Sequence, residues 1–313
     1  MMKRTRIAFI AVATICLLLV VMPGVGATSI KLDPLATSQG VMTASAASAY
    51  TASASANDNY PISLDQAKNN IRVFMGDLSL DPVLSTTGSL PIGNYYYFVA
   101  GNSTFTVNQN TGVVEFVHFG DNAQDSSEVV LTRDQAYANA TAYAGGKFTD
   151  FSSKNWKLVI DQVDTNYEWY YNPSTGNWDY VTVNAYNFVF REEKDHVLLP
   201  TLVHVSVNTK TGSIIDYWGV DRLLTLSSLE NTVSLSEAVA TAENHVGTSN
   251  MESTEGHREV IIQYQNLERL AWVVTLTENG GYSYVVVVDA NDGSFIGYHW
   301  DDIWPETWLR YNL

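Results

Sequence analysis

The chain has 313 residues, with 17 Lys or Arg against 33 Asp or Glu, and a formal net charge of −16. Such an acidic chain repels nucleic acid and anionic lipid surfaces, so neither is expected as a partner. Cys16 is the only cysteine, which excludes an intramolecular disulfide framework and a thiolate zinc site.

The N-terminal part of the chain is typical of an exported protein. Residues 1–27 combine a basic start, an apolar run and small residues near Ala27, which predicts a secretory signal peptide. The apolar run is short for a bilayer span of roughly 20 residues, and an uncleaved anchor is the alternative. Residues 28–60, rich in Ser, Ala and Thr, predict a flexible linker. We therefore expect a secreted or cell-envelope protein that meets the membrane only through an uncleaved N-terminal segment.

Three helices are predicted by one recurring start signal. Ser63, Thr132 and Ser234 are candidate N-caps, and each is followed three residues later by Gln or Glu, which predicts a capping box. A glycine lies 13 residues after each cap, as expected for a left-handed C-cap. These glycines are Gly76, Gly145 and Gly247. The predicted apolar faces are Leu64, Ala67, Ile71 and Phe74; Ala136, Ala140, Tyr143 and Ala144; and Leu235, Ala238, Ala242 and Val246.

A second recurring signal follows each helix. The pattern Val-[Asn/Asp]-x-x-[Thr/Asp]-Gly predicts a tight turn that ends at Gly112, Gly212 and Gly293, because Asn or Asp starts such turns and Gly supplies the positive φ. Apolar and β-branched runs flank every copy, which predicts strands. These strands are expected at 95–99, 105–107 and 113–117; at 201–207 and 214–217; and at 271–276, 282–288 and 295–298.

The order of these signals predicts an internal repeat. We expect an α+β fold with three tandem units, each of one helix packed on an antiparallel sheet. The units span residues 61–125, 130–222 and 232–300, and a C-terminal tail covers 301–313.

The third unit resembles the PepSY family. It carries Leu235-Ser236-Glu237-Ala238 at the helix start, a long hairpin over 271–288, and the turn from Val288 to Phe295 with the letters VDANDGSF. PepSY domains show an LSxxEA-like helix start and a VDAxTGxI-like turn, so Asp292 stands where Thr is usual. The resemblance implies three PepSY-like units that bind, inhibit or assist a protein or peptide partner, such as a peptidase, in the envelope or extracellular space. It carries over no catalytic residues.

A search for catalytic and metal-binding motifs is negative. The sequence has no His-Glu-x-x-His zinc signature, no Gly-x-Ser-x-Gly elbow and no phosphate-binding glycine loop. A calcium loop at 289–293 fits poorly, because its glycine falls one position early and Trp300 stands at the twelfth position. A cation cluster of His299, Asp301 and Asp302 is less favoured than a solvated acidic tail. We therefore expect no enzyme activity, no metal and no cofactor.

The middle unit is longer than the others and carries many aromatic residues. The segment 167–186 is predicted to be a hairpin inserted into this unit, with its loop at 172–177. Two interpretations stay open: cross-strand packing, or an exposed surface that binds a carbohydrate, a peptide or the cell surface. The candidate ligand-binding residues are Tyr167, Trp169, Tyr171, Trp178 and Tyr180.

Two sequons fit the N-glycosylation pattern. They begin at Asn102 and Asn139, and Asn139 falls on the second predicted helix. We expect glycosylation at these positions only where the modifying machinery exists.

Overall fold

The computed structural model describes residues 62–90, 93–123, 128–172, 177–247, 251–263, 267–279 and 283–300, and within these ranges no helix is long and apolar enough to cross a membrane. The predictions for residues 1–27 and 28–60 and for the tail, with Asp301 and Asp302, lie outside the described residues. So do the side chains of 166–181 and 298–300.

The described part is α+β, with three α-helices and a large, mostly antiparallel sheet of twelve strands. A helix followed by four strands occurs three times along the chain. The first group is α3 (Leu64–Met75), β1 (Val83–Leu90), β2 (Gly93–Ala100), β3 (Ser103–Asn108) and β4 (Val114–Phe119). The second is α4 (Arg133–Lys147), β5 (Trp156–Asn172), β6 (Asn177–Lys194), β7 (Val197–Asn208) and β8 (Ile214–Val220). The third is α5 (Leu235–Val246), β9 (Met251–Gln263), β10 (Leu267–Glu278), β11 (Ser283–Asp289) and β12 (Phe295–Trp300).

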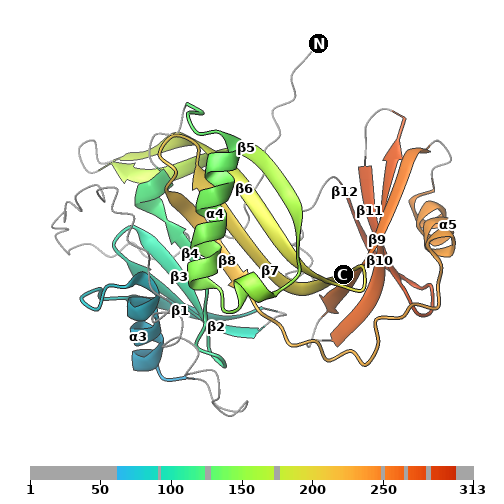
Figure 1. Ribbon diagram of the computed structural model, residues 1–313, viewed down its shortest axis with the longest axis horizontal. Helices are drawn as coiled ribbons and strands as arrows, with labels where there is room; N and C mark the ends of the chain where they lie inside the picture. Colours follow the sequence, from blue (N-terminus) through green and yellow to red (C-terminus); the bar gives the residue numbers. More distant parts are fainter. Residues whose placement is uncertain are drawn as a thin grey trace.

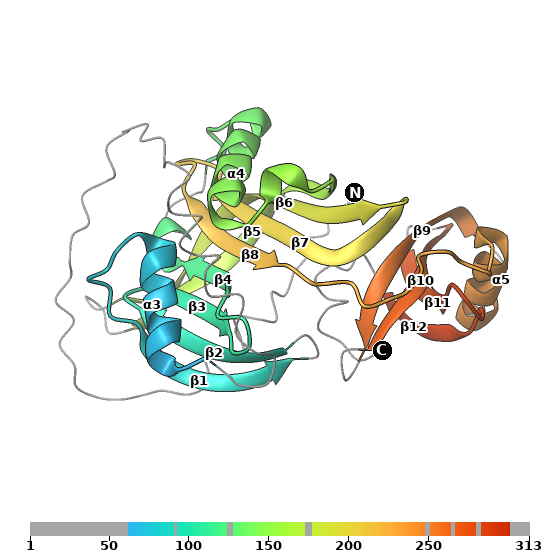
Figure 2. The ribbon, with the colours of Figure 1, turned by 60° about the horizontal axis from the view of Figure 1, so that its bottom comes forward.

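The sheet order shows how the three groups are joined. It runs β1-β2-β3-β4-β8-β7-β9-β10-β11-β12, and the hairpin β5–β6 attaches to β7 through β6. The first two groups meet where β4 pairs antiparallel with β8, as in Phe116 opposite Trp218. Among the described strand pairs, the third group is joined to the second by the pairing of β9 with β7. Figures 1 and 2 show the consequence: β9–β12 and α5 form a separate lobe beside the larger body.

The hydrophobic core is shared unevenly among the groups. Helices α3 and α4 pack into one continuous cluster that includes Phe74, Ala140 and Phe188, and the rings of Phe74 and Tyr217 lie 5.6 Å apart. Helix α5 has a cluster of its own, with Ala238, Ala242, Val286 and Val288. The first two groups therefore share one helix-covered core, whereas the helix of the third group covers a separate one.

The helix starts agree with the sequence. Ser63, Thr132 and Ser234 are the N-caps, and each hydroxyl accepts a bond from the backbone N–H three residues later. The reciprocal bond that completes a capping box is formed by Gln135 at α4 and by Glu237 at α5. The predicted stops at Gly76 and Gly247 are also confirmed, because both residues are left-handed C-caps.

The predicted stop at Gly145 is wrong. Helix α4 continues through Gly145 and Gly146 to Lys147, and its C-cap is Phe148 in extended conformation. The Phe148 ring is buried against Trp156, and the Lys147 ammonium bonds the carbonyl of Phe74 at the end of α3. These tertiary contacts favour one more half-turn over the local preference of glycine to end the helix.

Two residues of the predicted helix faces are exposed. Leu64 and Leu235 follow their caps directly and are 41% and 39% exposed, whereas the remaining predicted positions are buried or packed against the core. Both lie in the first turn, at the rim of the helix–sheet contact. Leu235 still approaches β9, because a Cβ placed on Gly256 would lie 2.4 Å from its Cδ1.

Six of the eight predicted strands lie within observed ones, and those at 113–117 and 282–288 begin one residue before β4 and β11. Strands β1 and β9 were not predicted, and β5 and β6 are longer than predicted. The hairpin expected at 167–186 is only the distal part of β5 and β6, which pair from Trp156–Glu192 to Asn172–Asn177. Strand β6 also pairs with β7. The extra length of the middle group is therefore due to two long strands and not to an insertion.

Candidate functional site

The three predicted turns share one set of contacts. The side chains of Asn108, Asn208 and Asp289 each accept the backbone N–H groups two and three residues later, at 2.8–3.4 Å. The turn ends at Gly112, Gly212 and Gly293, whose φ angles are 74–76°. These are the conformations that only glycine adopts without strain.

Each turn is bound to the start of its own helix. The residue before each N-cap, which is Ile62, Leu131 or Val233, donates its N–H to a turn carbonyl at 2.7–3.0 Å. A side chain seven residues after the cap donates to the carbonyl of the turn glycine. These three pairs are Asn70–Gly112 at 2.8 Å, Asn139–Gly212 at 3.2 Å and Thr241–Gly293 at 3.4 Å. The predicted cap and turn residues therefore connect each helix to its sheet.

The two candidate glycosylation residues are both exposed and hydrogen-bonded. Asn102 donates to Asp121 Oδ1 at 2.6 Å, and Asn139 donates to the Gly212 carbonyl. Glycosylation at either position remains a prediction.

The aromatic hairpin can be followed only in its backbone. The register sets Trp169 opposite Tyr180 and Tyr171 opposite Trp178, with Tyr167 opposite Thr182. Residues directly opposite in an antiparallel pair share a face of the sheet. Whether these side chains are exposed lies outside the described residues.

Sequence reasoning missed the site where the second and third groups join. We call it the junction and define it by Arg191, Asp195, Leu199, Arg258 and Glu259. It is centred on a change of neighbour along β7. Val197 and Leu198 pair in parallel with Arg258 and Glu259 of β9, and from Leu202 onward β7 pairs with β8 instead. Pro200 lies between the two stretches, and its lack of an N–H interrupts the ladder at the change.

Arg191 lies where the pairing between β6 and β7 becomes irregular. It lies on β6, where the β6–β7 register shifts, and its Nε donates to the carbonyl of Leu199 at 2.9 Å. Its Nη1 lies 3.5 Å from Glu259 Oε2, and both side chains are at most 3% exposed. One guanidinium thus satisfies a strand carbonyl and connects the body of the protein to β9.

Glu259 is a buried carboxylate with incomplete pairing. Burial opposes its ionisation, but the nearby Arg191 and His257 side chains hold its pKa below the usual range. Its Oε1 has no hydrogen-bond partner among the described residues. A buried charge of this kind depends on its partner, because an unpaired carboxylate inside a protein is costly.

Arg258 joins three further segments at the same place. It donates to the Leu229 carbonyl at 3.2 Å, to Asn231 Oδ1 at 2.8 Å and to the carbonyl of Asp195 at 2.9 Å. Asp195 and His196 form the β6–β7 turn with φ values of 52° and 60°, an uncommon conformation for residues other than glycine. An open hollow lies here, lined by Asp195, Ser228–Asn231 and Arg258.

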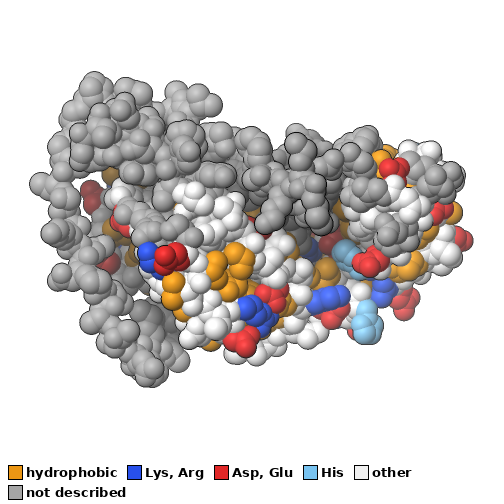
Figure 3. Space-filling view, turned by 90° about the horizontal axis from the view of Figure 1, so that it is seen from above, with side chains coloured by type: hydrophobic (Ala, Val, Ile, Leu, Met, Phe, Trp, Pro, Cys, Tyr) orange, Lys and Arg blue, Asp and Glu red, His pale blue; other side chains and the backbone are white. Residues whose placement is uncertain are grey.

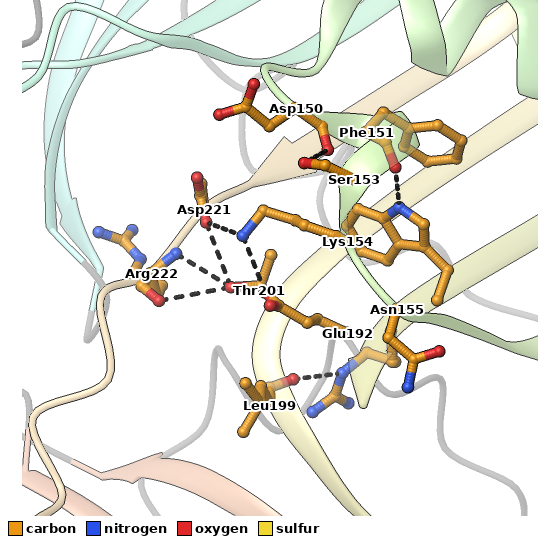
Figure 4. A network of polar contacts seen from close by, with 12 residues as sticks. Asp150, Phe151, Ser153, Lys154, Asn155, Glu192, Leu199, Thr201, Asp221 and Arg222 are labelled. Atoms are coloured by element: carbon orange, nitrogen blue, oxygen red, sulfur yellow. Dashed lines mark hydrogen bonds and ion pairs between the residues drawn. The ribbon is translucent and has the colours of Figure 1, made fainter. Parts of the chain in front are cut away.

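A second polar cluster lies on the body side of the junction. Figure 4 shows Lys154 between Glu192 and Asp221, at 2.9 Å and 3.2 Å, and Thr201 is hydrogen-bonded to Asp221 and Arg222.

Arg222 also connects this cluster to a buried carboxyl group. Its guanidinium donates to the Tyr95 hydroxyl, and that hydroxyl donates to buried Glu115. Burial raises the pKa of Glu115 despite the charge of Arg222. These contacts hold Asp221 and Arg222 in place at the start of the segment that connects β8 to α5.

Charged side chains of both signs lie side by side on the described surface. In Figure 3 the described part of one face carries acidic, basic and His side chains interspersed with apolar ones. No group of three or more His, Cys, Asp or Glu could hold a metal ion within the described ranges. The junction offers hydrogen-bonding and charged groups where β7 meets β9.

Comparison with known proteins defines the class of the third group. Residues 232–299 match the PepSY family, described as "Peptidase propeptide and YPEB domain". The segment contains α5 and β9–β12, so the chain contains a PepSY domain there. No curated protein matches the chain significantly.

A solved structure is also similar to this chain. It is the Bacillus megaterium YpeB C-terminal domain, at 16% identity and a TM-score of 0.44, covering 78% of this chain and 100% of that chain. PepSY domains are in general non-catalytic modules of the propeptide and peptidase-inhibitor type, which interact with peptidases or other proteins.

Proposed function

We propose that the chain is an exported, non-catalytic binding protein built from three tandem PepSY-like units, which restrains or assists a peptidase or another envelope protein. The observation that carries the proposal is the PepSY match over 232–299. It is supported by the equivalent helix–turn contacts at Gly112 and Gly212, which lie outside the matched segment.

Export is proposed from the N-terminal sequence. The basic start, apolar run and small residues of 1–27 are the basis for a signal peptide, and PepSY domains occur in exported proteins. The linker 28–60 would then separate the binding units from the point of export.

The test is capture of a partner. The chain from residue 28 onward, tagged at its C-terminus, is incubated with the envelope fraction of its own cells, and retained proteins are identified by mass spectrometry. We expect a polypeptide partner that survives a high-salt wash. Retention of cell-wall glycan alone would contradict the proposal, and so would hydrolysis of peptide, ester or glycoside substrates by the purified chain.

A second candidate function is favoured by the register of β5 and β6. Trp169 opposite Tyr180 and Tyr171 opposite Trp178 supports an aromatic surface for a carbohydrate or a cell-surface ligand. The double variant Trp169→Ala/Trp178→Ala separates the two functions. Under the leading proposal it keeps the polypeptide partner, whereas under the second it loses its ligand without a large change in melting temperature.

A further inference from the structure

Strand β9 is the outer strand of the PepSY sheet on the side that faces the body. It pairs with β10 from Gln263 to Met251. On its other side, β7 covers it only at Arg258 and Glu259. Among the described residues, the stretch from Thr254 to His257 has no strand partner on that side. An uncovered strand edge presents backbone donors and acceptors that another strand can pair with.

The cover provided by β7 is short and unlike the rest of the described sheet. It is the one parallel pairing among the described strand pairs, and it ends where Pro200 interrupts the ladder. The residues before it form a turn with two positive φ angles, at Asp195 and His196. The start of β7 is therefore a short segment that lies against β9 on one edge and pairs with β6 at Val197 and Leu198 on the other.

The polar contacts that hold this segment are few and incompletely satisfied. Arg191 and Glu259 meet through a single contact of 3.5 Å, and Glu259 Oε1 lacks a partner among the described residues. Arg258 holds the Asp195 carbonyl at 2.9 Å. Apolar packing of Val197 and Leu199 on Val260 and Leu270 completes the contact. A partly satisfied buried pair stabilises a closed state less than a complete network does.

We propose that the β9 edge is a strand-addition site for an extended segment of a partner polypeptide, and that the start of β7 occupies it as a releasable internal substitute. The inference rests on the proposed function, because it names where the partner binds. Strand addition supplies main-chain hydrogen bonds to such an edge, and side-chain pockets supply selectivity. Release of β7 extends the available edge from Thr254–His257 to Arg258 and Glu259.

The test uses the natural occupant as a probe. A fluorescein-labelled peptide with the sequence of residues 194–199, Lys-Asp-His-Val-Leu-Leu, is titrated against the full chain and followed by anisotropy. In Glu259→Gln the Arg191 contact is weakened, and we expect the peptide to bind at least tenfold more tightly than to the wild type. The matched control is Arg269→Gln, which removes the 3.1 Å ion pair with Asp289 in the same sheet, and it should bind like the wild type.

A double-cysteine variant, compared in its oxidised and reduced forms, provides a second test if Glu259→Gln does not fold. In a Cys16→Ser background, Val197→Cys/Arg258→Cys joins the two paired positions by a disulfide. The oxidised protein should not bind the peptide, and the same sample after reduction should bind it. Equal binding in the oxidised and reduced states, or no binding to any form, would overturn the inference. Either result leaves the capture of a partner from the envelope unaffected, so the two proposals fail separately.

Discussion

At the scale of single residues, the side chain seven positions after each N-cap is the contact that joins helix to turn. Asn70 is 8% exposed and donates to Gly112 at 2.8 Å, whereas Asn139 is exposed and donates at 3.2 Å. Removing a buried donor leaves the carbonyl unsatisfied, which costs about 1–3 kcal/mol. We therefore predict that Asn70→Ala lowers the free energy of unfolding in urea by about 2 kcal/mol. Asn139→Ala is the control and should cost less; the reverse order would contradict the account.

The turn glycines differ in the space around them. A Cβ on Gly112 would lie 2.7 Å from Asn70 Nδ2, whereas the nearest atom to a Cβ on Gly293 is 3.6 Å away, on Val233. Both have positive φ, which costs a residue with a side chain roughly 1–2 kcal/mol. We predict that Gly293→Ala costs about this amount and Gly112→Ala clearly more, as measured by thermal melting. Equal losses at the two positions would show that the Asn70 contact does not constrain the turn.

Glu237 links the helix cap to pH. Hydrogen bonds from the Ser234 backbone N–H and hydroxyl hold the pKa of Glu237 below the ordinary glutamate value. Its contribution to stability is therefore complete above that ordinary value and is lost as the pH falls through the lower, folded-state pKa. We predict an NMR-detected pKa below the ordinary glutamate value in the wild type and a partial return toward it in Ser234→Ala, because the variant loses the hydroxyl but keeps the backbone N–H. A pKa that does not change on Ser234→Ala would show that the hydroxyl does not contribute to the shift.

At the scale of elements, the sequence allowed the prediction of whatever depends on local chemistry. The N-caps at Ser63, Thr132 and Ser234 and the three turn glycines follow from hydrogen bonds within a few residues. The stop at Gly145 failed because Phe148 and Lys147 are held by distant residues. Strand β9 was missed because its first half, Met251 to Arg258, is polar and lacks an apolar run.

The junction could not be predicted from the sequence for a related reason. Arg191 and Glu259 lie 68 positions apart and belong to strands that meet only through the parallel pairing of β7 with β9. A signal was nevertheless present, since Pro200 inside an apolar strand indicates an interruption of the ladder. An arginine within the apolar run of β6 is a second such signal.

At the scale of the whole molecule, the buried pair couples the PepSY domain to the body. Removal of one partner of a buried ion pair costs about 3–5 kcal/mol, whereas replacement of both by apolar residues is often neutral. We predict that Glu259→Leu destabilises the chain by about this amount and that Arg191→Met/Glu259→Leu recovers most of it. Denaturation of both single variants and the double variant measures the coupling, and strictly additive losses would contradict the pairing.

We propose above that the PepSY domain contacts a polypeptide partner. The most direct measurement places a photo-crosslinking amino acid at Thr254, an exposed position on β9, and compares it with Thr165, an exposed position on β5, in native envelopes. We expect a protease-sensitive adduct between Thr254 and a protein. Adducts from Thr165 alone that resist protease and are removed by glycosidases would contradict it and would favour the aromatic hairpin as the binding surface.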